Sequence, residues 1–178
     1  VDDNYVYVGG WGPQTVWKLN KSNLSHADES ASYDGDINAI AVDDNYVYVG
    51  GSTTTTLWKL NKSNLSLVAE SASYGGNIYA IAVDDNYVYV GGGTKKVWKL
   101  NKTDLSWIDE NESYGGNINA IAVDDFYVYV GGGTTQRVWK LNKSNLSKVA
   151  ESESYGNDIN AIAVDDNYVY IGGWGPVK

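Results

Sequence analysis

The residues with the greatest capacity for chemistry in this chain are asparagines in Asn-x-Ser/Thr sequons. On the surface of a secreted protein such an asparagine is an acceptor for an N-linked glycan. The sequon asparagines are Asn20, Asn23, Asn61, Asn64, Asn101, Asn111, Asn142 and Asn145. Asn and Ser also hydrogen-bond to their own backbone in turns, so a turn-forming role for the same residues stays open. We expect some of these asparagines to carry glycans.

Pairs of adjacent aspartates are the second chemical feature, because calcium prefers several carboxylate and carbonyl oxygens as ligands. This makes four of these residues weak calcium candidates: Asp43, Asp44, Asp84 and Asp85. Adjacent side chains at the end of a strand point in opposite directions, however, so one pair cannot enclose an ion. The favoured interpretation is a hairpin turn, and no cofactor is predicted.

Three aromatic residues are candidates for contacts with a ligand or a partner. Trp11 and Trp174 lie in Gly-Gly-Trp-Gly-Pro segments, which hide a large ring poorly. Stacking on a sugar or a partner chain competes there with packing over a closing seam. Tyr79 stands where the other copies of the repeat have Asn, and it would line a channel mouth unless it is sequence drift. A separate group of tryptophans alternates with lysine and is predicted to be core: Trp17, Trp58, Trp98 and Trp139.

Catalytic chemistry has little support in the composition. The chain of 178 residues has no cysteine and one histidine, His26, with no nucleophile or carboxylate arrangement implied around it. The lack of cysteine removes disulfides, thiolate metal sites and cysteine nucleophiles. The glycine runs lie between two strands and precede no helix, a context that does not form a phosphate-binding loop. We therefore predict that the protein is not an enzyme.

Charge and hydropathy exclude two classes of partner. The net charge is −9, so the chain repels a nucleic-acid backbone. No apolar run approaches the ~18–20 residues that a membrane span requires. No methionine occurs, and position 1 is valine, so we expect a processed product or a slice of a longer array.

The elements that must position these residues come from an internal repeat. The string VDDNYVYVGG, or a close variant, starts at Val1, Val42, Val83, Val123 and Val164, at spacings of 41, 41, 40 and 41 residues. A fixed period of this size is typical of solenoids, propellers and repeat arrays. We treat residues 1–178 as a single repeat region.

One copy shows how each repeat folds. Short runs rich in Val, Ile, Tyr and Trp and bounded by Gly, Asn, Asp and Ser predict strands at 78–83, 87–90, 97–100 and 107–114. The first of them is apolar and the last is polar. This order predicts an all-β propeller of four-stranded antiparallel blades, with the apolar strand innermost.

The segment 77–106, NIYAIAVDDNYVYVGGGTKKVWKLNKTDLS, resembles propeller repeats of the YVTN and PQQ-like types. The resemblance covers the whole chain through its copies and implies the fold. It does not extend to the quinone and metal ligands of the PQQ enzymes, which have no counterpart in this sequence.

Strand counting predicts four blades plus an overlapping partial repeat. The last inner strand, 159–164, could complete the first blade, but the strand after it, 168–171, would then duplicate 5–8. Both ends share GGWGP, at 9–13 and 172–176. A small closed ring, a longer array and a ring of eight blades made from two such units all remain open. Surplus edge strands also favour self-association.

The predicted function is that of a non-catalytic structural or binding module of a secreted or cell-surface glycoprotein, acting in assembly or adhesion. Its expected partners are further repeats of the same chain and glycans, with no nucleic acid and no membrane span. The alternative is a carbohydrate-binding, lectin-like propeller. That alternative would use the face that carries the Gly-rich loops, which is opposite the face with the Asp-Asp-Asn and NKSNLS turns.

Overall fold

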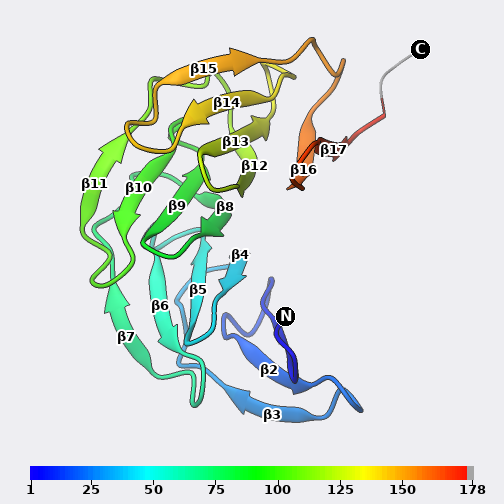
Figure 1. Ribbon diagram of the computed structural model, residues 1–178. Coiled ribbons are helices and arrows are strands. Elements are labelled where there is room, and N and C mark those ends of the chain that lie inside the picture. Colours follow the sequence, from blue (N-terminus) through cyan, green and yellow to red (C-terminus); the bar gives the residue numbers. More distant parts are fainter. Residues whose placement is uncertain (176–178) are drawn as a thin grey trace.

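The computed structural model describes residues 1–175, and every regular element in them is a β-strand (Figure 1). The inner strands are β4 (Ile37–Val42), β8 (Ile78–Val83), β12 (Ile118–Val123) and β16 (Ile159–Val164). The second strands are β1 (Tyr5–Val8), β5 (Tyr46–Gly51), β9 (Tyr87–Gly92), β13 (Tyr127–Gly132) and β17 (Val169–Gly173). The third strands are β2 (Trp17–Asn20), β6 (Trp58–Asn61), β10 (Trp98–Asn101) and β14 (Trp139–Asn142). The outer strands are β3 (His26–Glu29), β7 (Leu67–Glu70), β11 (Trp107–Glu110) and β15 (Lys148–Glu151).

Each strand pairs with the next in the chain, which gives five antiparallel sheets: sheet I (β1–β3), sheet II (β4–β7), sheet III (β8–β11), sheet IV (β12–β15) and sheet V (β16–β17). Sheets II, III and IV have four strands each, as the sequence predicted. Within residues 1–175, sheet I lacks an inner strand and sheet V lacks a third and an outer strand. The described part of the chain has no helix long and apolar enough to cross a membrane.

The five sheets follow one another along an open arc, with the inner strands on its concave side and the outer strands on its rim (Figure 1). Sheets I and V lie at opposite ends of this arc. The closed ring that strand counting allowed is therefore not formed by residues 1–175 themselves.

The hydrophobic core lies between sheets, because a single thin sheet cannot enclose one. Tyr7 and Val16 of sheet I pack with Val47 and Leu60 of sheet II in one buried cluster. In the equivalent cluster between sheets III and IV, Tyr89 of sheet III packs against buried residues of sheet IV. Every interior sheet thus depends on both of its neighbours.

Four of the second strands, β5, β9, β13 and β17, run on through both glycines of their Gly-Gly pair, where the sequence predicted that they stop, whereas β1 ends before its pair. Strand β8 carries a bulge between Ile78 and Ala80, which shifts its register against β9. A Cβ on Gly92 would lie 2.0 Å from the carbonyl oxygen of Asn77, and one on Gly91 would lie 2.5 Å from Cγ2 of Ile118 in the next sheet. The glycines are therefore required by close packing inside the strand.

The outer strand is shorter than predicted. It ends at Glu110, because the chain beyond it turns inward and buries Tyr114. The Tyr114 hydroxyl donates a hydrogen bond to the carbonyl oxygen of Arg137 in sheet IV (2.6 Å). The last residues of the predicted strand thus join two sheets.

Candidate functional site

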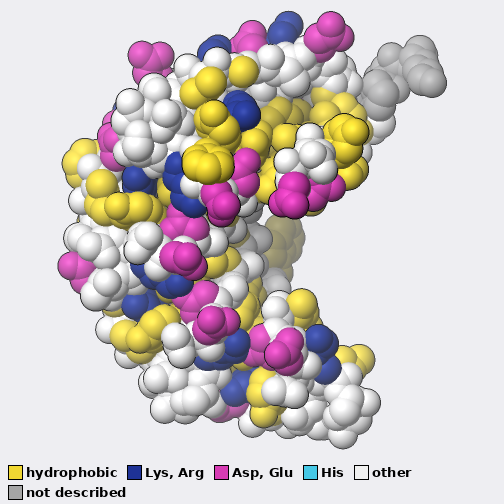
Figure 2. Space-filling view, viewed as in Figure 1, with side chains coloured by type: hydrophobic (Ala, Val, Ile, Leu, Met, Phe, Trp, Pro, Cys, Tyr) yellow, Lys and Arg dark blue, Asp and Glu magenta, His cyan; other side chains and the backbone are white. Residues whose placement is uncertain are grey.

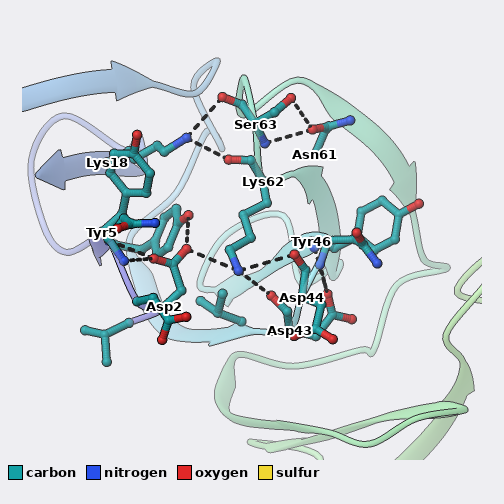
Figure 3. A pocket seen from close by; sticks show the side chains of 15 residues that line it. Asp2, Tyr5, Lys18, Asp43, Asp44, Tyr46, Asn61, Lys62 and Ser63 are labelled. Atoms are coloured by element: carbon teal, nitrogen blue, oxygen red, sulfur yellow. Dashed lines mark hydrogen bonds and ion pairs between the residues drawn. The ribbon is translucent and has the colours of Figure 1, made fainter.

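The recurring polar side chains converge between neighbouring sheets, on the face of the Asp-Asp-Asn turns. A groove of about 800 Å³ separates sheets I and II there, and one of about 900 Å³ separates sheets III and IV. Figure 2 shows carboxylate and lysine side chains intermingled along one face of the arc. We call each such meeting of two sheets a junction, and Figure 3 shows the first.

The first aspartate of each pair organises its junction. Oδ1 of Asp2 accepts hydrogen bonds from the backbone N–H groups of Asn4 (2.9 Å) and Tyr5 (2.7 Å). Oδ2 accepts from the hydroxyl of Tyr7 (2.9 Å) and forms an ion pair with Lys62 of sheet II (3.2 Å; Figure 3). The ion pair recurs as Asp43–Lys102 (2.8 Å) and Asp84–Lys143 (2.9 Å).

Lys62 is one of four lysines at equivalent positions of the repeat: Lys21, Lys62, Lys102 and Lys143. We call them returning lysines, because the last three reach back to an aspartate of the preceding sheet. Besides its ion pair with Asp2, the Lys62 ammonium donates to the carbonyl oxygen of Asp43 in its own sheet (2.9 Å). One side chain therefore holds two sheets at once.

A second lysine crosses the junction the other way in the first three copies. We call these residues and the equivalent residue of the next copy forward lysines: Lys18, Lys59, Lys99 and Lys140. The Lys18 ammonium donates to the carbonyl oxygens of Lys62 (2.9 Å) and Ser63 (3.0 Å), and it lies 4.2 Å from the ring centroid of Tyr5. Burial lowers the pKa of Lys99, as it does that of Lys59.

The prediction that the third-strand tryptophans are core is confirmed in part. Trp58, Trp98 and Trp139 are half-buried and pack against the buried clusters, whereas Trp17 is 41% exposed. The lysines between them are more buried still, with Lys59 and Lys99 3% exposed. The three later tryptophans also pack edge-on against a tyrosine of the loop that precedes their sheet, at 5.1–5.2 Å between centroids.

The junction carboxylates should make stability depend on pH. Burial alone would raise the pKa of Asp84, but bonds from Lys143 and from the N–H groups of Asn86 and Tyr87 outweigh it and lower the pKa below its usual 3.8. A carboxyl with a lower pKa in the folded state stabilises the fold above its unfolded pKa, and this contribution is lost as pH falls through the folded pKa. We expect the free energy of unfolding to decline below about pH 4.

The Asp84→Asn variant should unfold about 1–2 kcal/mol more easily at pH 7 and show a weaker acid decline. Asp85→Asn is the matched control, since Asp85 accepts no hydrogen bond from residues 1–175. Urea unfolding at pH 3 to 7 measures both. An equal acid decline in Asp84→Asn and the parent chain would contradict this assignment.

The sequon asparagines take part in turns. Oδ1 of Asn61 accepts from the N–H (2.8 Å) and hydroxyl (2.7 Å) of Ser63, and Asn64 bonds Ser66 in the same way. Asn111 differs, because it is 5% exposed and accepts from the buried N–H of Val97 (2.6 Å). This burial makes Asn111 the least accessible of the eight candidates in the folded chain. Glycan attachment at the others remains a prediction.

The calcium candidates divide by role. Asp43 and Asp84 are engaged in the junctions, and Asp44 and Asp85 are exposed. Residues 1–175 contain no group of three or more His, Asp or Glu side chains arranged to hold a metal ion. The hydrogen bonds that Oδ1 of Asp43 accepts from the backbone N–H groups of Asn45 and Tyr46 fit the hairpin-turn interpretation.

The aromatic candidates lie apart from one another. Trp11 is 83% exposed in sheet I's loop, and Trp174 is 71% exposed at the opposite end of the arc; Pro176 of the second GGWGP segment lies outside the described residues. Tyr79 is the bulge residue of β8, and its hydroxyl accepts from the Asn77 amide (3.2 Å). The structure does not gather these residues into one site.

The opposite face, with the Gly-rich loops, holds a smaller hollow of about 310 Å³. Its polar lining includes Lys95, Asn119 and Asp158. Residues that recur in every copy thus concentrate at the junctions, and the variable loops border this hollow.

The chain matches no protein-family model and no curated protein. Its structure is similar to crystal structures of two computationally designed proteins. Ika8 matches with a TM-score of 0.82 at 18% identity, over 97% of this chain and 53% of Ika8. Ika4 matches with a TM-score of 0.74 at 17% identity, over 82% of this chain and 89% of Ika4.

At these identities the likeness shows the fold alone. The chain spans about half the length of Ika8. By its structure it is an all-β repeat protein, in which units of about 40 residues each form a four-stranded antiparallel sheet.

Proposed function

We propose that this chain is a non-catalytic structural and binding module of the β-propeller type, part of a secreted or cell-surface protein that acts in assembly or adhesion. One observation carries the proposal: the polar residues that recur in every copy hold neighbouring sheets together. At the three junctions between sheets I and IV, a forward lysine donates to carbonyl groups of the next sheet and a returning lysine pairs with the first aspartate of the preceding sheet. Residues that make these bonds have a structural role in the repeat array.

The propeller arrangement has two supports. The sheets follow a curved path with apolar inner strands on the concave side, which is the order of blades in a propeller (Figure 1). The segment 77–106, which resembles YVTN and PQQ-like repeats, forms the first three strands of sheet III.

Sedimentation velocity tests the assembly role. We expect species heavier than the 19.4 kDa chain at micromolar concentration, with a smaller share at high salt because lysine–carboxylate pairs are screened. A chain that stays monomeric in the open form at every concentration would exclude assembly as its function.

Expression through a eukaryotic secretory pathway tests the surface location and the glycans. Intact mass should show glycan additions that disappear on treatment with a glycosidase, and peptide mapping should leave Asn111 unmodified. A secreted chain with all eight candidate asparagines bare would remove the glycoprotein part of the proposal.

A second candidate is carbohydrate binding on the Gly-rich face. The polar hollow beside Asn119 and Asp158 favours it, since amide and carboxylate groups are common partners of sugar hydroxyls. Binding of the purified chain to a glycan array tests this second function. If the chain binds no glycan on the array, carbohydrate binding is excluded as its function.

A further inference from the structure

We propose that two copies of this chain close into one ring, in which inner strand β16 of each copy releases β17 and pairs with β1 of the other copy. This inference rests on the assembly function proposed above and names the partner. Each exchange would give sheet I the inner strand that it lacks. It would also give sheet V the third and outer strands that it lacks.

The two competing strands are almost the same in sequence. Residues 164–175 repeat residues 1–12 with a single difference, Ile171 for Val8. In the present register Val164 lies opposite Val169 and Ile159 lies opposite Gly173. In the exchanged register the same two residues would lie opposite Val6 and Gly10. The backbone hydrogen bonds that β16 loses when it releases β17 would therefore be regained with β1. Because β2 and β3 belong to the same sheet as β1, they would join β16 as well.

The missing inner strand leaves a vacant edge on sheet I. Val8 is 45% exposed, whereas its equivalent in sheet II, Val49, is fully buried. A Cβ on Gly10 would meet nothing within 4 Å, although one on the equivalent Gly51 would lie 1.8 Å from the carbonyl oxygen of Asp36. Nothing within residues 1–175 requires a glycine at position 10. A glycine would be required there only if an inner strand were paired with β1.

Sheet V shows the complementary defect. Tyr170 is 54% exposed, whereas the equivalent Tyr89 in sheet III is fully buried. In sheet III that tyrosine is covered by residues of the next sheet, among them Ile118 and Val128, and no sheet follows sheet V within residues 1–175. After the exchange, Tyr7 of the second copy takes the place of Tyr170, and sheet II of that copy covers it as it does in the single chain.

The two ends also hold matching halves of the polar junction. Among residues 1–175, the carboxylate of Asp124 forms no ion pair with a returning lysine of a following sheet, although its carbonyl oxygen accepts from Lys143 of its own sheet (2.7 Å). The forward Lys140 has no carbonyl partner there. At the other end, Lys21 bonds the carbonyl oxygen of Asp2 but no carboxylate of a preceding sheet. A second copy would place its Lys21 beside Asp124, and the carbonyl oxygens of Lys21 and Ser22 before Lys140.

An aromatic contact completes the match. Tyr33, Tyr74 and Tyr114 each pack against the third-strand tryptophan of the sheet that follows. Tyr155 is the next tyrosine of this series, and Trp17 is the one such tryptophan in residues 1–175 without a preceding sheet. The exchange brings Trp17 of one copy to Tyr155 of the other.

Two observations favour a second copy over closure of the chain on itself. The two ends of the arc lie well apart (Figure 1). The chain also fits Ika8 over 97% of its own length but spans only 53% of Ika8, so a second copy would supply the length that remains. Two identical exchanges related by a twofold axis close the two arcs into one ring.

Disulfide trapping tests the exchange directly, because the chain has no cysteine of its own. The backbone N–H of Asp165 donates to the carbonyl oxygen of Tyr168, so these two residues form a hydrogen-bonded pair. Hydrogen-bonded and non-hydrogen-bonded pairs alternate along an antiparallel ladder, so the next pair, which contains Val164, is of the closely spaced, non-hydrogen-bonded kind. Such a pair has Cα atoms about 4.5 Å apart, within reach of a disulfide. The double variant Val6→Cys/Val164→Cys should therefore oxidise to a covalent dimer of twice 19.4 kDa.

The matched control is Val164→Cys/Val169→Cys, which should trap the β16–β17 hairpin as a monomer and stop the exchange. Three outcomes with Val6→Cys/Val164→Cys overturn the inference: a cross-linked monomer, which means closure on itself; a ladder of larger polymers; or no cross-link at all.

Two glycine variants supply a second test without cysteines. Gly10→Ala should leave unfolding of the monomer unchanged but reduce the dimer at least tenfold, because the new methyl group blocks β16 of the partner copy. Gly173→Ala should raise the dimer fraction, since its methyl group would lie 2.0 Å from the carbonyl oxygen of Asp158 and expel β17. Association of Gly10→Ala at the parent level would overturn the exchange and leave the assembly function standing. A parent chain that shows no association at all would overturn both the exchange and the assembly function.

Discussion

Replacing Gly92 with alanine is expected to destabilise the chain by about 3 kcal/mol or more, because the new methyl group has no space to enter. Its Cβ would lie 2.0 Å from the carbonyl oxygen of Asn77 and 3.1 Å from Cα of Ile78. Both are backbone atoms, so no change of rotamer relieves the overlap. The β8–β9 pairing would have to separate, which opens the core on both sides of sheet III. Urea unfolding followed by tryptophan fluorescence measures the loss.

Gly10→Ala is the control for this prediction, since it makes the same chemical change at the same position of another copy. No atom lies within 4 Å of a Cβ on Gly10. We expect a change of at most about 0.5 kcal/mol in the unfolding of the monomer. Equal losses in the two variants would mean that the effect comes from backbone conformation and not from the inner strand.

The strands were predictable because the repeat shows the same pattern several times. The apolar run 78–83 was predicted at the bounds that β8 has. Turn residues on both sides of each run fixed the order of the four strands in every copy. The curvature of the array and the openness of the ring were not predictable, since they depend on the angle between packed sheets.

The burial of the third-strand lysines was not predictable from the strand pattern, for a physical reason. Alternation of Trp98 with Lys99 shows that the two side chains point in opposite directions. In a stack of sheets both faces of a strand meet neighbouring sheets, so this alternation does not tell a buried face from a solvated one. Lys99 is the more buried because it finds carbonyl acceptors in the next sheet.

The junction as a site left no local signal in the sequence. Lys99 binds the backbone of residues 143 and 144, which lie in the next copy. The pairs Asp43–Lys102 and Asp84–Lys143 likewise join different copies. The available signal was the recurrence of these residues in each repeat. It indicated a structural role but did not show which residues bind one another.

Replacing Lys99 with methionine is the second change with a large expected effect, a loss of about 2 kcal/mol in the free energy of unfolding. Methionine keeps most of the apolar stem, so packing against Tyr87 is largely preserved. The ammonium is lost, and with it the bonds to the carbonyl oxygens of Lys143 (2.7 Å) and Ser144 (3.2 Å). These acceptors are left without their charged donor inside the junction.

Lys140→Met separates the junction bonds from the stacking. Lys140 lies 3.7 Å from the ring centroid of Tyr127, much as Lys99 lies 4.0 Å from that of Tyr87, but no sheet within residues 1–175 offers it carbonyl acceptors. Its replacement should therefore change the unfolding of the monomer by less than about 1 kcal/mol, the range of an exposed cation–π contact. It should weaken association if a second copy supplies those acceptors. Equal losses of monomer stability in the two variants would assign the effect to the tyrosine contact, and the forward lysines would no longer explain how the sheets are joined.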